Sequence, residues 1–268
     1  MDIFNLTGEV AVVIGATGEL GGHAAEALAQ AGASIAIIGR NAERGQARVQ
    51  SILHQGGKAA FFAADASQKQ SLQSVQKSII QELGTPSILV NAAGGNSPAA
   101  TTSPEHGFEQ IEQADWQKLI DTNLMAGIIL PCQVFGTAMC RQGKGSIINF
   151  ASVSAHIPLS KVVAYSASKA AVLNLTRFLA REWAPHGVRV NSVTPGFFPA
   201  QQNRSLLFNE DGSPTERTRS IWNHTPMGRF GKPEELAGAI LLLASPRAGS
   251  FITGSDIRVD GGFLSQTI

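Results

Sequence analysis

Short apolar segments alternate with longer segments of helical periodicity along most of the chain. The apolar segments lie at 10–14, 34–39, 59–64 and 87–95, and the helical patterns between them lie at 18–32, 41–55 and 67–83. Apolar runs without alternating polar positions are typical of strands that are buried on both faces of a parallel sheet. The pattern therefore predicts an α/β fold, with a doubly wound parallel sheet covered by helices on both faces.

The same alternation continues in the second half of the chain after a polar break at 96–114. It predicts helices at 115–141 and 162–184, strands at 146–152, 188–196 and 257–259, and a helix that begins near Pro233. Residues 197–225 show no clean periodicity, and we expect them to form an excursion that acts as a substrate lid. Because no repeat, linker or low-complexity tract interrupts the chain, we expect one domain over residues 1–268.

Composition narrows the functional classes. Lys and Arg total 21 and Asp and Glu total 20, so the net charge of +1 gives no basic surface for nucleic acid or an acidic membrane. Cys132 and Cys140 match no disulfide framework or metal-ligand spacing, so we expect reduced thiols and no metal site.

The first residues, MDIFNLTGEV, lack the basic region of a signal peptide. We also expect no membrane span, because no apolar run approaches roughly 18 residues, and we expect a cytoplasmic protein.

The first predicted strand runs directly into the sequence G-A-T-G-E-L-G at 15–21, which opens the first predicted helix. Glycines at such a junction let the backbone turn tightly and approach a pyrophosphate, whose charge then meets the helix N-terminus. Glycines also occur in ordinary strand-to-helix turns, which is the alternative interpretation. The position at the start of a strand–helix–strand array favours a dinucleotide and a Rossmann-type fold.

The end of the second predicted strand indicates which dinucleotide binds. NAD sites usually place an acidic residue there to hold the ribose 2′-hydroxyl, whereas NADP sites offer an arginine to the 2′-phosphate. The sequence here is Gly39-Arg40-Asn41, with no acid. We therefore expect NADP to be preferred, with NAD as the alternative, unless Arg40 is an ordinary surface residue.

Tyr165 and Lys169 stand one helical turn apart, so their side chains project from one face. A nearby ammonium group stabilises a phenolate and lowers the tyrosine pKa, so this pair can move the proton that accompanies hydride transfer. Ser152, predicted at the carboxyl end of a strand, can donate a hydrogen bond to a substrate carbonyl oxygen. Spacing alone does not choose between Ser152 and the nearby hydroxyls of Ser154, Ser166 and Ser168.

Taken together, these motifs resemble the short-chain dehydrogenase/reductase family along essentially the whole chain. The resemblance rests on the glycine loop at 15–21, Asp65, NAAG at 91–94, Asn123, Ser152, YSASK at 165–169, PG at 195–196 and the final DGG. It implies a catalytic tetrad. Tyr165 is the acid or base, Ser152 orients the carbonyl, Lys169 binds the nicotinamide ribose and lowers the tyrosine pKa, and Asn123 holds a water of the proton relay.

The resemblance also implies a cofactor site that runs along the carboxyl ends of the strands. Besides Tyr165 and Lys169, its residues are Gly15, Thr17, Gly18, Glu19, Leu20, Gly21, Arg40, Asn41, Asp65, Ala66, Asn91, Ala92, Gly94, Pro195, Gly196 and Phe198. The chain departs from the family pattern where Ile14 replaces a threonine, Glu19 a glycine, and Ala92 an asparagine.

Within the family the chain is most similar to the D-mannonate oxidoreductase and fructuronate reductase branch, through segments 92–102, 202–204 and 209–236. This implies a secondary alcohol and a ketone on a sugar acid, whose carboxylate needs a cation. Arg204 is our candidate, with Arg217, Arg219 and His224 as competitors, and His156 is expected to face the substrate together with Ser152 and Tyr165.

Two alternatives to this function stay open. One is a reductase for another carbonyl substrate, such as a sugar, steroid or acyl ketone. The other is a non-catalytic dinucleotide sensor, which we would expect to lack part of the tetrad. The resemblance also implies a homotetramer or homodimer packed through the helices at 115–141 and 162–184.

Overall fold

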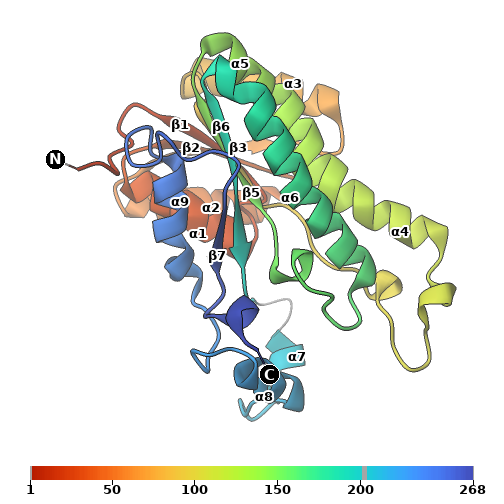
Figure 1. Cartoon of the computed structure of the whole chain (residues 1–268). Coiled ribbons are helices and arrows are strands. Elements are labelled where there is room, and N and C mark those ends of the chain that lie inside the picture. Colours follow the sequence, from red (N-terminus) through yellow and green to blue (C-terminus); the bar gives the residue numbers. More distant parts are fainter. Residues whose placement is uncertain (1, 201–203, 268) are drawn as a thin grey trace.

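The computed structural model describes residues 2–200 and 204–267, and its centre is a parallel sheet (Figure 1). In the described part of the chain the sheet has seven strands, in the order β3-β2-β1-β4-β5-β6-β7. The strands are β1 (Val10–Ile14), β2 (Ser34–Gly39), β3 (Lys58–Ala63), β4 (Ile88–Asn91), β5 (Gly145–Phe150), β6 (Val188–Pro195) and β7 (Asp256–Val259). All six strand pairs are parallel, which confirms the predicted doubly wound sheet.

The strand order reverses between β1 and β4, because β3 ends one side of the sheet and the chain then crosses to the other side of β1. Such a reversal leaves a crevice at the carboxyl ends of the two strands, where open α/β sheets bind their ligands. The glycine loop that follows β1 and the NAAG segment that begins at the end of β4 both lie there. The topology thus brings together two motifs that are about 70 residues apart in sequence.

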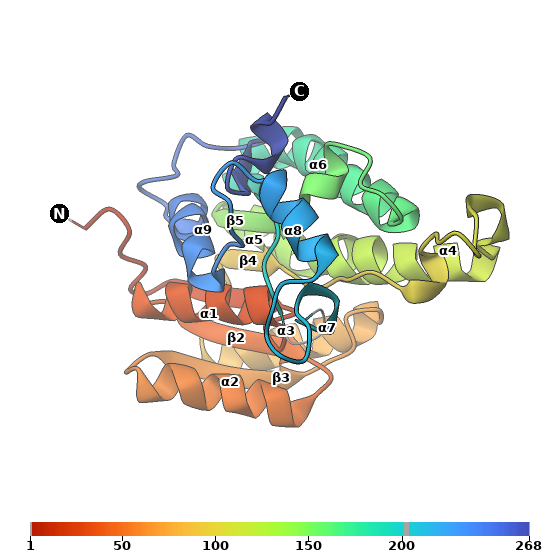
Figure 2. The same cartoon turned by 90° about the horizontal axis from the view of Figure 1, so that it is seen from below.

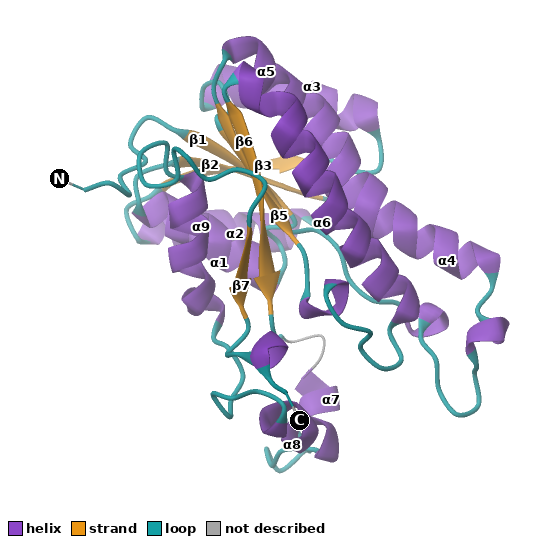
Figure 3. Ribbon diagram, in the orientation of Figure 1, coloured by secondary structure: helices purple, strands orange, loops and turns teal. Residues whose placement is uncertain are grey.

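Helices cover both faces of the sheet, as predicted (Figure 3). Each face has its own apolar core. One layer contains α1 (Glu19–Gln30), α2 (Ala42–His54) and α9 (Ala237–Ala244). The other layer contains α3 (Lys69–Glu82), α4 (Gln113–Ile120), α5 (Thr137–Gln142) and α6 (Val163–Trp183). The β1 side chains alternate between the two cores, which explains why the whole segment is apolar.

Helices α4 and α5 are the ends of one long helix, Gln113–Gln142. Its middle contains two π-helical segments, Asp121–Ile129 and Cys132–Gly136. The most apolar 18-residue window of this helix has the length and mean hydropathy of a membrane span, although polar residues interrupt its apolar runs. Half of the most apolar window is buried inside the protein, however, and Cys132 and Phe135 pack in the core beneath the sheet. A core helix of a water-soluble domain meets the same criteria, so the helix alone does not indicate a membrane protein.

The predicted excursion after β6 contains two short helices, α7 (Arg204–Leu207) and α8 (Glu216–Asn223). They lie beyond the carboxyl ends of β6 and β7, and a view from below shows α8 crossing this edge (Figure 2). A small separate core holds them together, formed by Leu207, Ile221 and Phe230 with neighbouring aromatic rings. The segment therefore lies at the edge of the sheet where the crevice opens.

Candidate active site

Tyr165 and Lys169 lie on the first two turns of α6, beside the carboxyl end of β5. The Lys169 side chain is buried, and its Nζ donates a hydrogen bond to the backbone oxygen of Phe150 at 2.7 Å. Nζ also lies 5.8 Å from the centre of the Tyr165 ring. Burial removes the water that would solvate an ammonium group, and it lowers the Lys169 pKa from 10.5 to about 8.

Ser152 stands two residues beyond the end of β5, not within the strand as predicted, and begins the turn that follows. Its hydroxyl oxygen accepts a hydrogen bond from the Ser154 amide at 3.2 Å, which fixes the start of this turn. The Ser152 hydroxyl is also hydrogen-bonded to the Tyr165 side chain. The structure therefore brings Ser152 to the phenol. The Ser166 hydroxyl instead donates to the Val162 backbone oxygen, and the Ser168 hydroxyl donates to the Tyr165 backbone oxygen.

The expected lowering of the Tyr165 pKa is wrong for this structure. Burial of the phenol raises its pKa, and the hydrogen bond with Ser152 opposes this effect only in part. The Lys169 Nζ donates to the Phe150 oxygen and lies 5.8 Å from the centre of the Tyr165 ring, and it is not among the causes of the shift in the Tyr165 pKa. The sequence shows the spacing of the two residues but not the burial that dominates both pKa values.

Asn123 joins the long helix to the NAAG segment and to α6. Its Oδ1 accepts the Gly95 amide at 2.8 Å, and its Nδ2 donates to the Gly95 oxygen at 2.9 Å and to the Ser168 hydroxyl at 3.0 Å. Gly94, with a φ of +144°, packs so closely that an added Cβ would lie 2.9 Å from the Asn123 Oδ1. The fully buried Asn123 lies in a π-helical segment, an irregularity that often marks functional positions.

The glycine loop has the close backbone packing that a dinucleotide requires. Gly15 has a φ of +85°, and an added Cβ there would lie 2.6 Å from the Ala93 amide nitrogen. A Cβ on Gly21 would lie 2.5 Å from the Gly15 oxygen. Gly18 is the N-cap of α1 and has no side chain that could accept hydrogen bonds from the first backbone amides. These amides therefore stay available to an anion. This cradle fits a pyrophosphate group.

Glu19, the departure from the family pattern, occupies the first position of α1. Its carboxylate lies 3.3 Å from the His23 Nε2, one helical turn along. The preceding Thr17 packs beside Gly39, where a Cβ would lie 2.9 Å from the threonine methyl group. Leu20 is partly buried against the core, so it supports the loop from beneath.

Arg40 directly follows β2 and Asp65 comes two residues after β3, the neighbouring strand, where an adenosine would be expected. Arg40 is exposed, and its charge contributes a small part of the lowering of the Asp65 pKa. The larger causes are hydrogen bonds to Asp65 from the amide and hydroxyl of Ser67, at 2.9 and 2.8 Å. Asn41 caps α2 by accepting the Arg44 amide, so its side chain is already committed, and Ala66 follows in the same turn as Asp65.

Asn91 does not offer its side chain to the crevice. It is fully buried, and its Nδ2 donates to the Asn149 Oδ1 at 2.9 Å and lies 3.4 Å from the Cys132 Sγ. It therefore fixes the end of β4 under the loop that Ala92 and Gly94 form. The Cys132 thiol is free, and burial raises its pKa to about 12, as suits an unreactive core residue.

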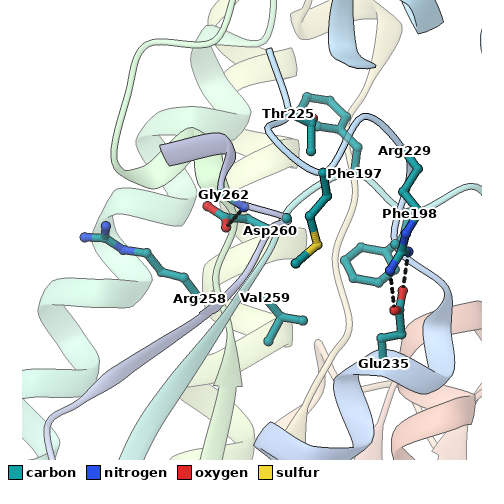
Figure 4. A pocket seen from close by; sticks show the side chains of 12 residues that line it. Phe197, Phe198, Thr225, Arg229, Glu235, Arg258, Val259, Asp260 and Gly262 are labelled. Carbon is teal, nitrogen blue, oxygen red and sulfur yellow. Dashed lines mark hydrogen bonds and ion pairs between the residues drawn. The ribbon is translucent and has the colours of Figure 1, made fainter. Parts of the chain in front are cut away.

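The end of β6 borders a cavity of about 400 Å³ between Phe198 and Val259 (Figure 4). Pro195 ends the strand, and a Cβ on Gly196 would lie 2.7 Å from the Asp260 Cα, so the turn packs tightly on the C-terminal segment. The cavity is lined by Phe197, Met227 and the ion pair Arg229–Glu235, and by none of the predicted tetrad. It lies beside the crevice and is not its catalytic part.

The two remaining predicted substrate residues, Arg204 and His156, lie on different elements. Arg204 begins α7, and its guanidinium group lies 5.5 Å from the centre of the Phe208 ring. His156 stands four residues beyond Ser152, and its Nε2 lies 3.2 Å from both the Thr194 hydroxyl oxygen and the Asp256 carboxylate. Sequence reasoning missed Asp256, which follows His156 by 100 residues with no local spacing to reveal the pair.

Comparisons with known proteins agree with this geometry. The family model described as enoyl-(acyl carrier protein) reductase matches residues 15–264. UxuB, an uncharacterised oxidoreductase of Bacillus subtilis, is 41% identical over 271 residues, which cover 98% of this chain and 97% of the relative.

Solved structures of similar proteins carry bound nicotinamide dinucleotides. A Haemophilus influenzae protein with bound NAD, described provisionally as a D-mannonate oxidoreductase, is 36% identical, with a TM-score of 0.92 over 98% of this chain and 97% of that chain. A gluconate 5-dehydrogenase of Burkholderia cenocepacia, in complex with NADP and tartrate, is 31% identical, with a TM-score of 0.87 over 99% of each chain. The chain belongs to the short-chain dehydrogenase/reductase family and is an NAD(P)-dependent oxidoreductase that acts on CH–OH groups.

Proposed function

We propose that this enzyme interconverts a secondary alcohol and a ketone on a sugar acid of the D-mannonate/D-fructuronate type. The observation that carries the proposal is the likeness of the whole chain to the Haemophilus influenzae structure, at a TM-score of 0.92. The apolar lid core and the polar side chains of Ser152 and His156 at the same edge of the sheet support a small polar substrate.

The proposed catalytic roles follow from the contacts of the four residues. The dinucleotide, when bound, supplies or accepts the hydride. In the direction of ketone reduction, the Tyr165 phenol gives its proton to the carbonyl oxygen while the Ser152 hydroxyl donates a hydrogen bond to the same oxygen. Burial keeps Tyr165 protonated and therefore able to donate. Asn123 holds the 94–95 backbone against α6, beside Lys169, where the proton can be replaced.

We propose that the dinucleotide lies from Arg40 and Asp65, across the glycine loop, to Pro195–Phe198, with NADP preferred. Exposed Arg40 can pair with a 2′-phosphate, and β2 ends without an acid, but Asp65 beside Arg40 moderates this preference. The test is fluorescence titration of NADPH and NADH with the wild type and Arg40→Ala. The variant is expected to bind NADPH about 10-fold more weakly, equivalent to about 1.4 kcal/mol, with NADH unchanged. Equal binding of both dinucleotides by the wild type contradicts the preference.

The substrate is tested by reducing a panel of ketones with NADPH and with NADH in parallel. Fructuronate is expected to be reduced with the highest kcat/KM, and Arg204→Ala is expected to raise its KM because the carboxylate loses a cation. An unchanged KM removes Arg204 from the site. Arg217→Ala, on the next lid helix, tests the competing arginine, and a rise in KM for this variant alone would assign the carboxylate to Arg217.

A second candidate is a gluconate-type dehydrogenase, which the likeness to the Burkholderia cenocepacia structure favours. Preferred reduction of 5-ketogluconate over fructuronate would support it, and activity only on neutral ketones would exclude both sugar acids. We further expect a cytoplasmic homotetramer or homodimer, which size-exclusion chromatography with light scattering would distinguish.

A further inference from the structure

Asp256 lies on β7 beside β6, and its carboxylate contacts the polar side chains of three neighbouring residues. The Ser192 hydroxyl donates to Oδ1 at 2.6 Å, and the Thr194 hydroxyl lies 2.9 Å from each carboxylate oxygen. The His156 Nε2 lies 3.2 Å from Oδ2 and 3.2 Å from the Thr194 oxygen. Ser192 and Thr194 are buried, and the side chains of His156 and Asp256 are only 16% and 11% exposed.

The two neighbours of the His156 Nε2, Thr194 and Asp256, determine whether this atom carries a proton. A carboxylate can only accept hydrogen bonds, so the single proton of the Thr194 hydroxyl is directed to Asp256. The Thr194 oxygen then faces His156 with a lone pair. Both neighbours of Nε2 are acceptors, and therefore Nε2 carries a proton in either charge state of the ring. The contact of His156 with β6 and β7 is a directional donation from one defined atom.

This donation anchors the turn that carries Ser152. The turn is closed by two backbone hydrogen bonds, from the Ala155 amide to the Ser152 oxygen at 2.9 Å and from the His156 amide to the Val153 oxygen at 3.1 Å. Ser152 thus begins the turn, and His156, whose imidazole is held by Thr194 and Asp256, ends it. On the β6 side, Thr194 directly precedes the Pro195–Gly196 turn. The hydrogen-bonded group joins the two backbone segments that border the crevice.

We propose that His156 and Asp256 are positioning residues, whose hydrogen bond holds the Ser152 turn against the end of β6 and so places the Ser152 hydroxyl at Tyr165. Neither residue needs to touch the reacting atoms for this role. A displacement of about 1 Å at a catalytic group can lower the rate about 100-fold. Loss of the His156–Asp256 hydrogen bond is therefore expected to slow the reaction by displacing Ser152. The proposal concerns the reaction of the family and holds for whichever ketone the enzyme reduces.

The test compares His156→Gln with His156→Asn. The glutamine amide nitrogen can take the place of Nε2 and donate to Asp256, whereas the asparagine amide is too short. His156→Gln is expected to keep kcat within about 3-fold of the wild type, and His156→Asn and Asp256→Ala to lower kcat about 10- to 100-fold with NADPH binding unchanged. The double variant His156→Asn/Asp256→Ala is expected to be no slower than Asp256→Ala alone, because Asp256→Ala already removes the acceptor of the His156 hydrogen bond.

A second readout is independent of substrate. The chain contains a single tyrosine, so absorbance near 295 nm follows the ionisation of Tyr165 alone. Loss of the Ser152 hydrogen bond is expected to raise the Tyr165 pKa, as in a Ser152→Ala reference. His156→Asn should match that reference, and His156→Gln should match the wild type. Equal kcat for the two His156 variants, or a tyrosine titration unaltered by His156→Asn, overturns the proposal. Failure of every ketone in the panel refutes the proposed function only, because the tyrosine titration still decides this inference.

Discussion

Replacing Lys169 by methionine is expected to change how the stability of the protein depends on pH. The Lys169 side chain is 4% exposed, and burial lowers its pKa from 10.5 to about 8. Below pH 8 the amine is protonated in both the folded and the unfolded chain, and the full penalty for burying the charge is present. Between pH 8 and 10.5 the unfolded chain binds more protons, so the free energy of unfolding rises with pH through this window.

The size of the effect follows from the shift in pKa. Each unit corresponds to 1.36 kcal/mol, so the penalty at pH 7 is about 3 kcal/mol and vanishes by about pH 10.5. Methionine removes the charge but also leaves the Phe150 oxygen without the 2.7 Å hydrogen bond from Nζ, at a cost of about 1–3 kcal/mol. The two effects offset one another at neutral pH. The informative quantity is therefore how the difference in unfolding free energy between the wild type and Lys169→Met changes with pH.

Urea unfolding of the wild type and Lys169→Met, without dinucleotide, would be measured from pH 7 to 10.5. The wild type is expected to gain about 3 kcal/mol relative to the variant across this range, since all other titrating groups cancel in the difference. Lys77→Met, at an exposed position of α3, is the matched control and should show no such trend. Parallel curves for the wild type and Lys169→Met would refute the reasoning, because they would mean that burial does not lower the Lys169 pKa.

Two further substitutions test the proton donor and the glycine loop. Tyr165→Phe is expected to lower kcat by at least about 100-fold and leave NADPH binding unchanged, since no other phenol exists in the chain; retained turnover would contradict the assigned donor. Gly21→Ala is expected to weaken NADPH binding severely, because its Cβ would lie 2.5 Å from the Gly15 oxygen, whereas Gly238→Ala on α9 meets no atom within 4 Å and should be neutral or stabilising by about 1 kcal/mol. Fluorescence titration and urea unfolding check both glycine variants, and similar NADPH affinities for the two would contradict the proposed cradle.

The sheet and its two helical layers could be predicted from the sequence because their signals are local. The β1 segment is apolar at every position, which only a strand covered on both faces requires. The two lid helices could not be predicted. They have four and eight residues, too short to be stable alone, and they depend on packing among Leu207, Ile221 and Phe230. Such tertiary packing leaves no periodic signal in the segment itself.

The candidate site shows the same division. Gly15 and Gly21 could be recognised because tight packing excludes every larger side chain at a fixed spacing. The partner of His156 could not, because Asp256 is brought to it only by the pairing of β6 with β7. The direction of the Tyr165 pKa shift was also inaccessible, since spacing reveals a nearby lysine but not how completely the fold removes water from the phenol.

The opposite shifts of Lys169 and Tyr165 define the proton state in which the enzyme rests. Burial lowers the ammonium pKa to about 8 and raises the phenol pKa, so at neutral pH the stable combination is a protonated tyrosine beside a protonated lysine. That state is ready to donate a proton, and ketone reduction should proceed at a constant rate from pH 6 to 8. Alcohol oxidation needs a base, and its kcat/KM should rise as the pH passes through about 8, where half of Lys169 has released its proton. Measurement of both directions from pH 6 to 10 with one alcohol and ketone pair checks this, and an oxidation rate that falls above pH 8 would show that another group controls the proton.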